Sequence, residues 1–139
     1  MKWMYILLVS IMLFSCKEKR ITQEEILGIY ENLSTVPPWN GVKNVIVLNA
    51  NSTFEHSIYR YDSILIKEEG MWKYRTEYNL NIITFDSFTS YIQYQTEEML
   101  KGEVSFKVKK DIWGSIYLPV TIPYDPDGSP ITPKYKKIK

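Results

Sequence analysis

The 139-residue chain has one cysteine, one histidine and no marked excess of charge of either sign. A single cysteine excludes an intrachain disulfide and a cysteine-rich metal site, and a single histidine excludes a histidine-based metal cluster. The 17 basic side chains nearly balance the 16 acidic ones, whereas a nucleic-acid binder needs a basic excess or stripe. We therefore expect no metal, no cofactor and no nucleic-acid partner.

Catalytic constellations are also missing. No Gly-x-Ser-x-Gly nucleophile elbow is present. Ser57 directly follows His56, but neighbours on a strand point to opposite faces, so we expect His56 to be a surface or partly buried structural residue. We expect solvated element ends rather than paired catalytic carboxylates at the three acidic doublets, Glu24-Glu25, Glu68-Glu69 and Glu97-Glu98. The chain is therefore not expected to be an enzyme.

The composition that remains is that of a globular domain, with 45% hydrophobic and 24% charged residues. The length allows one domain and leaves no room for two sizeable cores. The first residues stand apart, because Lys2 precedes an apolar run from Met4 to Phe14. This layout is typical of a secretory signal, and the run is shorter than the roughly 20 residues that span a bilayer. A short membrane anchor or a buried helix is the alternative.

The cysteine follows this run directly. Leu13-Phe14-Ser15-Cys16 resembles the lipobox of bacterial lipoproteins, although Phe14 stands where that pattern prefers a small residue. The resemblance implies a signal peptide over 1–15, cleavage before Cys16, and a diacylglycerol on the Cys16 sulfur. Two or three acyl chains, at about 0.8 kcal/mol per buried methylene, make a stable membrane anchor. The alternative role for Cys16 is that of a buried free thiol.

The residues after the cysteine carry sorting information in such lipoproteins. Lys17 stands where an Asp usually implies inner-membrane retention. Lys17-Glu18 is similar to the export tag of surface lipoproteins in the Bacteroidetes, although Lys19 replaces the second acid. These resemblances imply a lipid-anchored protein of the bacterial cell envelope, at the outer membrane and on its periplasmic or surface-exposed face. Loss of Lys2 with the signal leaves a neutral body, so the acyl chains would provide the anchor.

After a tether over 16–21, we predict a single β domain over 22–139. Thr22-Gln23-Glu24-Glu25 predicts a capping box and a short helix at about 22–27, and a further helical turn is predicted over 97–102, ended by Gly102. The remaining signals are those of strands. We predict them at about 28–33, 43–49, 53–60, 63–67, 70–76, 79–86, 90–96, 103–109, 115–122 and 134–138.

Two of these strands alternate cleanly, with apolar residues on one face only, which predicts one buried face. They are 103–109, with Val104, Phe106 and Val108, and 115–122, with Ile116, Leu118, Val120 and Ile122. The run 45–48 is apolar at every position and predicts a strand covered on both faces. Asn49 to Ser52 predicts a tight hairpin. Short strands joined by turns indicate an antiparallel meander that closes into a barrel, or alternatively a β-sandwich.

Four segments in order carry a resemblance to the small lipocalin-like (calycin-type) domains of bacterial lipoproteins. They are Gly28-Ile29-Tyr30, the polar turn with Phe within 47–54, Gly70-Met71-Trp72, and the strand 80–85. The resemblance covers about 22–86, with Tyr30 in place of the usual Trp. It implies an up-and-down barrel whose interior holds one small apolar ligand. The alternative is ordinary β-bend chemistry of any all-β domain.

Aromatic residues are the most unusual bulk feature, with 11 tyrosines and four tryptophans. Aromatic rings stack on apolar ligands and sugar faces, while a hydroxyl fixes orientation. Cross-strand pairing on an ordinary sheet is the alternative role for these rings, Tyr78 among them. The function predicted first is binding of a small apolar ligand, glycan or peptide, and the second is a non-enzymatic accessory or inhibitory role toward an envelope protein. The candidate ligand-binding residues are Tyr59, Tyr61, Trp72, Tyr74, Tyr91, Tyr94 and Tyr117.

Overall fold

The computed structural model describes residues 20–33, 41–91, 99–119 and 134–139. Cys16 and Tyr94 lie outside these ranges, as do parts of the strands predicted over 90–96 and 115–122. Within them the chain forms one helical turn, α2 (Gln23–Ile26), followed by strands. The strands are β1 (Gly28–Leu33), β2 (Val42–Leu48), β3 (Thr53–Arg60), β4 (Ser63–Glu77), β5 (Leu80–Tyr91), β6 (Met99–Lys110), β7 (Ile116–Pro119) and β8 (Lys134–Lys137).

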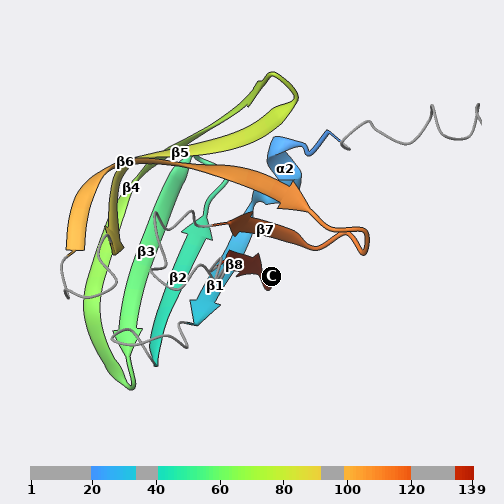
Figure 1. Ribbon diagram of the computed structural model, residues 1–139. Helices are drawn as coiled ribbons and strands as arrows, with labels where there is room; N and C mark the ends of the chain where they lie inside the picture. The colour runs from blue at the N-terminus through green and yellow to red at the C-terminus, as the bar shows by residue number, and fades with distance from the viewer. Residues whose placement is uncertain (1–19, 34–40, 92–98, 120–133) are drawn as a thin grey trace, which may run out of the picture.

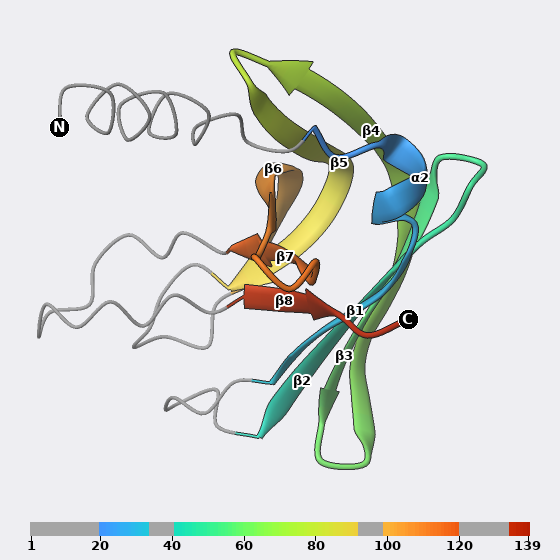
Figure 2. The same cartoon turned by 90° about the vertical axis from the view of Figure 1, so that its right-hand side faces the viewer.

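Each strand pairs antiparallel with the next one along the chain, and β8 pairs with β1 to close a barrel (Figures 1 and 2). The closing ladder matches Tyr30 with Lys137, and Ile29 extends it through two 2.8 Å backbone hydrogen bonds to Ile138 and Lys139. The all-β prediction with a short N-terminal helix is confirmed, and the barrel rather than the sandwich is observed. An eight-stranded antiparallel barrel is consistent with a lipocalin-like fold.

Alternation along the strands decides which side chains enter the barrel. Phe106 and Val108 on β6, and Ile116 and Leu118 on β7, are buried as predicted. The prediction that 45–48 is covered on both faces is wrong, because burial along β2 alternates and Val45 is only half-buried. A barrel of one sheet covers a strand on its inner face alone.

Strand β4 is continuous, so the predicted break between 67 and 70 is wrong. Its first half, to Met71, pairs with β3, and its second half, from Trp72, pairs with β5. Gly70 is in the strand because the Phe54 ring lies against it: a Cβ at Gly70 would stand 2.6 Å from Phe54 Cε1. The glycine makes room for a ring and does not end the strand.

Strand β5 is likewise continuous, where a break between 86 and 90 was predicted. A register shift between Phe85 and Phe88 lets both rings enter the core. The predicted helical turn at 97–102 is wrong for its described part, because Met99 to Gly102 belong to β6 and Gly102 pairs with Phe88. A β-bulge within β5 therefore lies where the sequence predicts a gap between two strands.

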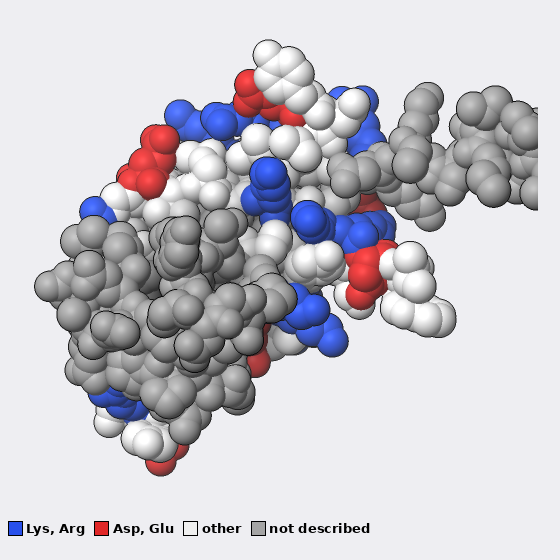
Figure 3. Space-filling model, viewed as in Figure 1, with Lys and Arg blue, Asp and Glu red and all other residues white. Residues whose placement is uncertain are grey.

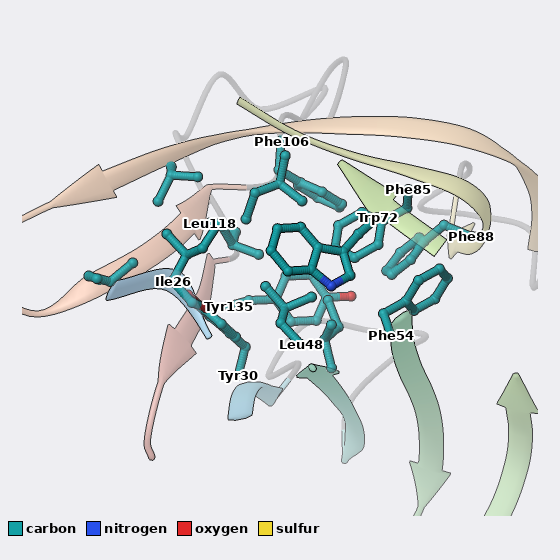
Figure 4. Packing of buried hydrophobic residues seen from close by; sticks show 14 of the residues in the cluster. Ile26, Tyr30, Leu48, Phe54, Trp72, Phe85, Phe88, Phe106, Leu118 and Tyr135 are labelled. Atoms are coloured by element: carbon teal, nitrogen blue, oxygen red, sulfur yellow. The ribbon is translucent and has the colours of Figure 1, made fainter. Parts of the chain in front are cut away.

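One end of the barrel is filled by large side chains beneath α2 (Figure 4). Phe54, Phe85 and Phe88 pack as an aromatic group, with a T-shaped contact of 4.8 Å between the Phe54 and Phe85 ring centroids. Trp72 is 1% exposed, and Ile26 from α2 is fully buried against this cluster. We call this region the closed end.

The α2 turn is fastened by polar contacts as well as by burial. Thr22 and Glu25 form the predicted capping box. Lys110 Nζ donates to Glu25 Oε1 at 2.6 Å, and Lys137 Nζ donates to the Glu25 carbonyl at 2.7 Å. The Tyr30 hydroxyl donates to the Ile26 carbonyl at 2.7 Å. The turn is thereby tied to β1, β6 and β8, so it closes this end of the barrel.

Candidate functional site

A groove with a volume of about 660 Å³ lies between Ile21 and the β6–β7 hairpin. Its apolar lining includes Leu80, Val108 and Tyr117, together with Ile112 and Trp113 of the hairpin turn. Ligand pockets in proteins commonly measure about 300–1,000 Å³ and have mostly apolar walls with a few polar groups. The groove is therefore of a size that suits a small molecule, and about half of its lining is polar, including Asn81, Lys107 and Asp111.

Basic side chains give the groove its charge. Lys107 and Lys109 are exposed on the outer face of β6, and neither has an ion-pair partner among the described residues. Figure 3 shows Lys and Arg side chains gathered over this part of β6. Lys110 is engaged by Glu25, and hydrogen bonding to Lys110 holds the pKa of Glu25 down at about 2. The groove thus presents two cations without an ion-pair partner in the described part of the chain, beside the apolar side chains of its lining.

The structure distributes the candidate aromatic residues over several places. Tyr117 lines the groove, with Lys134 Nζ 5.2 Å from the centre of its ring. Trp72 is in the core, where its Nε1 donates to the Asn49 carbonyl at 3.2 Å. The Tyr74 hydroxyl contacts the Ile21 carbonyl and lies 2.6 Å from Asn81 Oδ1.

The other candidates are not brought to the groove. Tyr59 is half-buried on β3, and Tyr61 is 82% exposed in the β3–β4 turn. Tyr91 ends β5, but its side chain, like Tyr94, lies outside what the structure describes. The ligand-binding role of these aromatic residues stays a prediction, and only Tyr117 is placed in the groove.

A polar layer inside the barrel was not foreseen. His56 is fully buried, and its Nδ1 lies 2.8 Å from Glu68 Oε1. Glu68 also accepts from the Thr89 backbone N–H at 2.7 Å and from the Thr89 hydroxyl at 2.8 Å, and Lys101 Nζ lies 3.3 Å from Oε2. The expectations of an accessible or partly buried His56 and a solvated Glu68 are therefore wrong.

The protonation states in this polar layer follow from burial and hydrogen bonding. Burial lowers the pKa of His56, although Glu68 acts in the opposite direction. Burial alone would raise the pKa of Glu68, but the hydrogen bonds from His56 and Thr89 outweigh it and leave that pKa low. A neutral His56 therefore donates Nδ1–H to an ionised Glu68.

Two polar atoms of the polar layer lack a partner among the described residues, His56 Nε2 and Asn44 Oδ1. With Nδ1 protonated, Nε2 is an acceptor, as is the Asn44 oxygen. Asn44 on β2 pairs with Ile58 on β3. His56 lies two residues before Ile58 on the same strand, so the side chains of Asn44 and His56 both face the barrel interior. The arrangement is rigid, because the His56 ring stacks on Phe88 with centroids 4.2 Å apart.

Metal-binding clusters and membrane-spanning helices are both absent from the described residues. Over the described ranges no cluster of three or more His, Cys, Asp or Glu side chains has a geometry to hold a metal ion. In that part of the chain no helix has the length and apolarity needed to cross a bilayer. Comparison with protein-family models, curated proteins and solved structures finds no significant match for this chain. The resemblance of this chain to other proteins is therefore limited to the architecture of its barrel.

Proposed function

We propose that this protein is an acylated lipoprotein of the bacterial envelope whose barrel binds a small ligand in the groove beside Ile21. It acts by binding and not by catalysis. The observation that carries this proposal is the groove itself, which combines a volume of about 660 Å³ with several apolar lining residues and two lysines that no described residue pairs. A ligand with an apolar body and an acidic group matches this combination.

The anchor is the second part of the proposal. The lipobox-like residues before Cys16 support acylation there, and the attached chains would hold the domain at the outer membrane. Replacing Cys16 with Ala should leave an uncleaved precursor without lipid. Intact mass and detergent partitioning measure this outcome, and a variant that still partitions like a lipoprotein would overturn the anchor.

Ligand binding is tested on the non-acylated chain 16–139 carrying Cys16→Ser. The protein is incubated with envelope extract and its native mass is recorded. We expect an added mass that disappears on denaturation and identifies the ligand. In the double variant Lys107→Glu, Lys109→Glu the occupancy should fall several-fold.

The matched control is Lys67→Glu with Lys73→Glu, which reverses two exposed charges on β4 outside the groove. Its occupancy should equal that of the unmodified domain. Equal loss in the control and the groove variant would mean that net charge, and not the groove, governs binding. A bare mass from well-folded protein would remove the ligand from the proposal.

A second function is favoured by a different observation, the filling of the closed end. Trp72, Tyr30, Phe54, Phe85 and Phe88 are all less than 2% exposed, so they occupy space that a carrier barrel leaves for cargo. An accessory or inhibitory lipoprotein that binds another envelope protein needs no such cavity. Crosslinking in intact envelopes, followed by mass spectrometry, tests this alternative.

A further inference from the structure

The turn between β6 and β7 exposes two large apolar side chains where turns usually carry polar ones. Ile112 is 92% exposed and Trp113 is 86% exposed. They occupy the two central positions of the turn, between Asp111 and Gly114. An adjacent pair of this kind, at the tip of a hairpin, is a feature that a solvated loop does not need.

The turn is held in one conformation by its own hydrogen bonds. The Gly114 N–H donates to the Asp111 carbonyl at 3.1 Å, and Gly114 adopts a positive φ of 88°. The Asp111 carboxylate accepts from the backbone N–H groups of Trp113 and Ser115 at 2.9 and 2.8 Å. The two apolar side chains are therefore displayed by a fixed scaffold, and little conformational entropy remains to be lost on binding.

The surroundings of the tip are basic. Lys107 and Lys109 precede it on β6, Lys110 ends that strand, and Arg20 is exposed next to Ile21. Figure 3 shows the basic side chains close to this projection of the molecule. An exposed Trp and Ile with lysines on the preceding strand match a phospholipid surface, where the indole lies among the headgroups and the cations face anionic lipid.

The position of the tip relative to the anchor supplies the second argument. Ile21 and Trp113 line the same groove. Five residues lead from Cys16 to Ile21, and a chain of that length spans at most about 18 Å. An acyl anchor at Cys16 would therefore hold the bilayer close to the end of the barrel that carries the tip.

We propose that the Ile112–Trp113 tip is a membrane-docking element that inserts into the headgroup region of an anionic phospholipid surface. It orients the barrel with its groove toward the bilayer. This inference rests on the proposed acyl anchor for its geometry, whereas the affinity of the tip for anionic lipid is a property of the described residues alone.

The test uses tryptophan fluorescence and brominated lipids, which quench a tryptophan within the bilayer by contact. The acylated chain carrying Trp39→Phe is reconstituted into vesicles of phosphatidylethanolamine and phosphatidylglycerol, after its acylation is verified by mass. The mature chain then retains Trp72, which the core shields, and Trp113. We expect at least a twofold loss of the Trp113 emission in brominated vesicles, and no such loss when Trp113→Phe is added.

Two further variants separate docking from simple tethering. Lys107→Glu with Lys109→Glu should reduce the quenching, because the cations then repel the anionic surface. Ile64→Ser removes an exposed apolar side chain from the β3–β4 hairpin, at the other end of the barrel in Figure 1, and should leave the quenching unchanged. Equal quenching in every variant would show that the tether alone brings the domain to the lipid, and would overturn the proposal.

Failure of the anchor and failure of the tip give different results. An acylated chain whose Trp113 stays unquenched would overturn the docking element and indicate that the tip faces a protein partner. If Cys16 carries no lipid, the non-acylated chain is mixed with the same vesicles at low salt. Quenching of Trp113 there would support the tip without the anchor, and its absence would overturn both.

Discussion

The closed end and the polar layer are built on the same strands, yet they treat buried polar groups differently. At the closed end, Trp72 Nε1 and the hydroxyls of Tyr30 and Tyr74 each reach a backbone carbonyl. In the polar layer, Glu68 collects several donors while His56 Nε2 and Asn44 Oδ1 have no described partner. A buried polar atom without a partner costs about 1–3 kcal/mol. The hydrogen bonding of the closed end therefore favours stability, whereas the polar layer loses some stability through its two atoms without a described partner.

The largest loss of stability should come from removing a large buried side chain from the closed end. Trp72→Ala removes a fully enclosed ring and one of the two donors to the Asn49 carbonyl, which keeps the Ser52 backbone N–H. We expect a loss of about 3–5 kcal/mol in the free energy of unfolding, measured by urea titration. Met71→Ala removes the neighbouring side chain, which is 55% exposed, and should cost less than about 0.5 kcal/mol. Comparable losses from both substitutions would contradict the packing described here.

The next effect concerns the carboxylate at the centre of the polar layer. Glu68→Gln takes the negative charge away from His56, Thr89 and Lys101, and we expect a loss of about 3 kcal/mol. Glu69→Gln is the matched control, since Glu69 is exposed and directly adjacent. It should change the urea midpoint little. If the two variants unfold at the same midpoint, Glu68 does not have the structural role assigned to it.

A smaller difference in stability is expected between variants of two buried asparagines. The side-chain oxygen of Asn81 has a hydrogen-bond partner, whereas that of Asn44 has none among the described residues. Asn81 Oδ1 lies 2.6 Å from the Tyr74 hydroxyl, whose single proton it shares with the Ile21 carbonyl, so Asn81→Leu should destabilise the domain by about 1 kcal/mol. Asn44→Leu replaces an unpartnered oxygen by an apolar group of similar volume, and should be neutral or stabilising by up to about 1 kcal/mol. Destabilisation by Asn44→Leu would reveal a bound water or ligand on that oxygen.

The smallest effect is a dependence of stability on pH. Because burial lowers the pKa of His56, the unfolded chain binds a proton near pH 6.5 while the folded chain does not. Stability should therefore be full above about pH 6.5 and fall as the pH decreases below it. His56→Gln keeps a donor toward Glu68 and should flatten this dependence between about pH 5 and 7. The urea midpoint, recorded along a pH series, measures the difference.

Much of the barrel could be predicted from local patterns. The limits of β1 and β3 agree with the predicted strands. Gly28 follows the short helix and begins β1, and the turn at Asn49 to Ser52 precedes β3, whose buried positions recur with period two. The capping box at Thr22 was also readable, since it depends on residues three apart. The errors at Gly70 and at 86–90 share one cause. In both places a tertiary contact, the Phe54 ring or a β-bulge, keeps a strand intact where propensity indicates a break.

The polar layer could not be predicted because it depends on register. Counting back from the two-residue turn at Tyr61 and Asp62 pairs His56 with Lys67. The register shift between Ile58 and Tyr59 moves the pairing by one residue, so that His56 meets Glu68. A single bulge thereby decides whether a lysine or a glutamate stands beside the histidine. The groove depends in turn on how Ile21 and the β6–β7 hairpin approach in space, for which no local pattern exists.

The order of strands along the chain also governs when the barrel can close. Every ladder joins strands that are neighbours in sequence, except the one between β1 and β8. During synthesis β1 therefore keeps one edge unpaired until β8 has been made, and the hairpins between them form first. An open edge invites pairing with other chains, so the interval before closure is the period of greatest risk of aggregation. Factors that act on nascent chains would protect this protein most effectively by covering the free edge of β1.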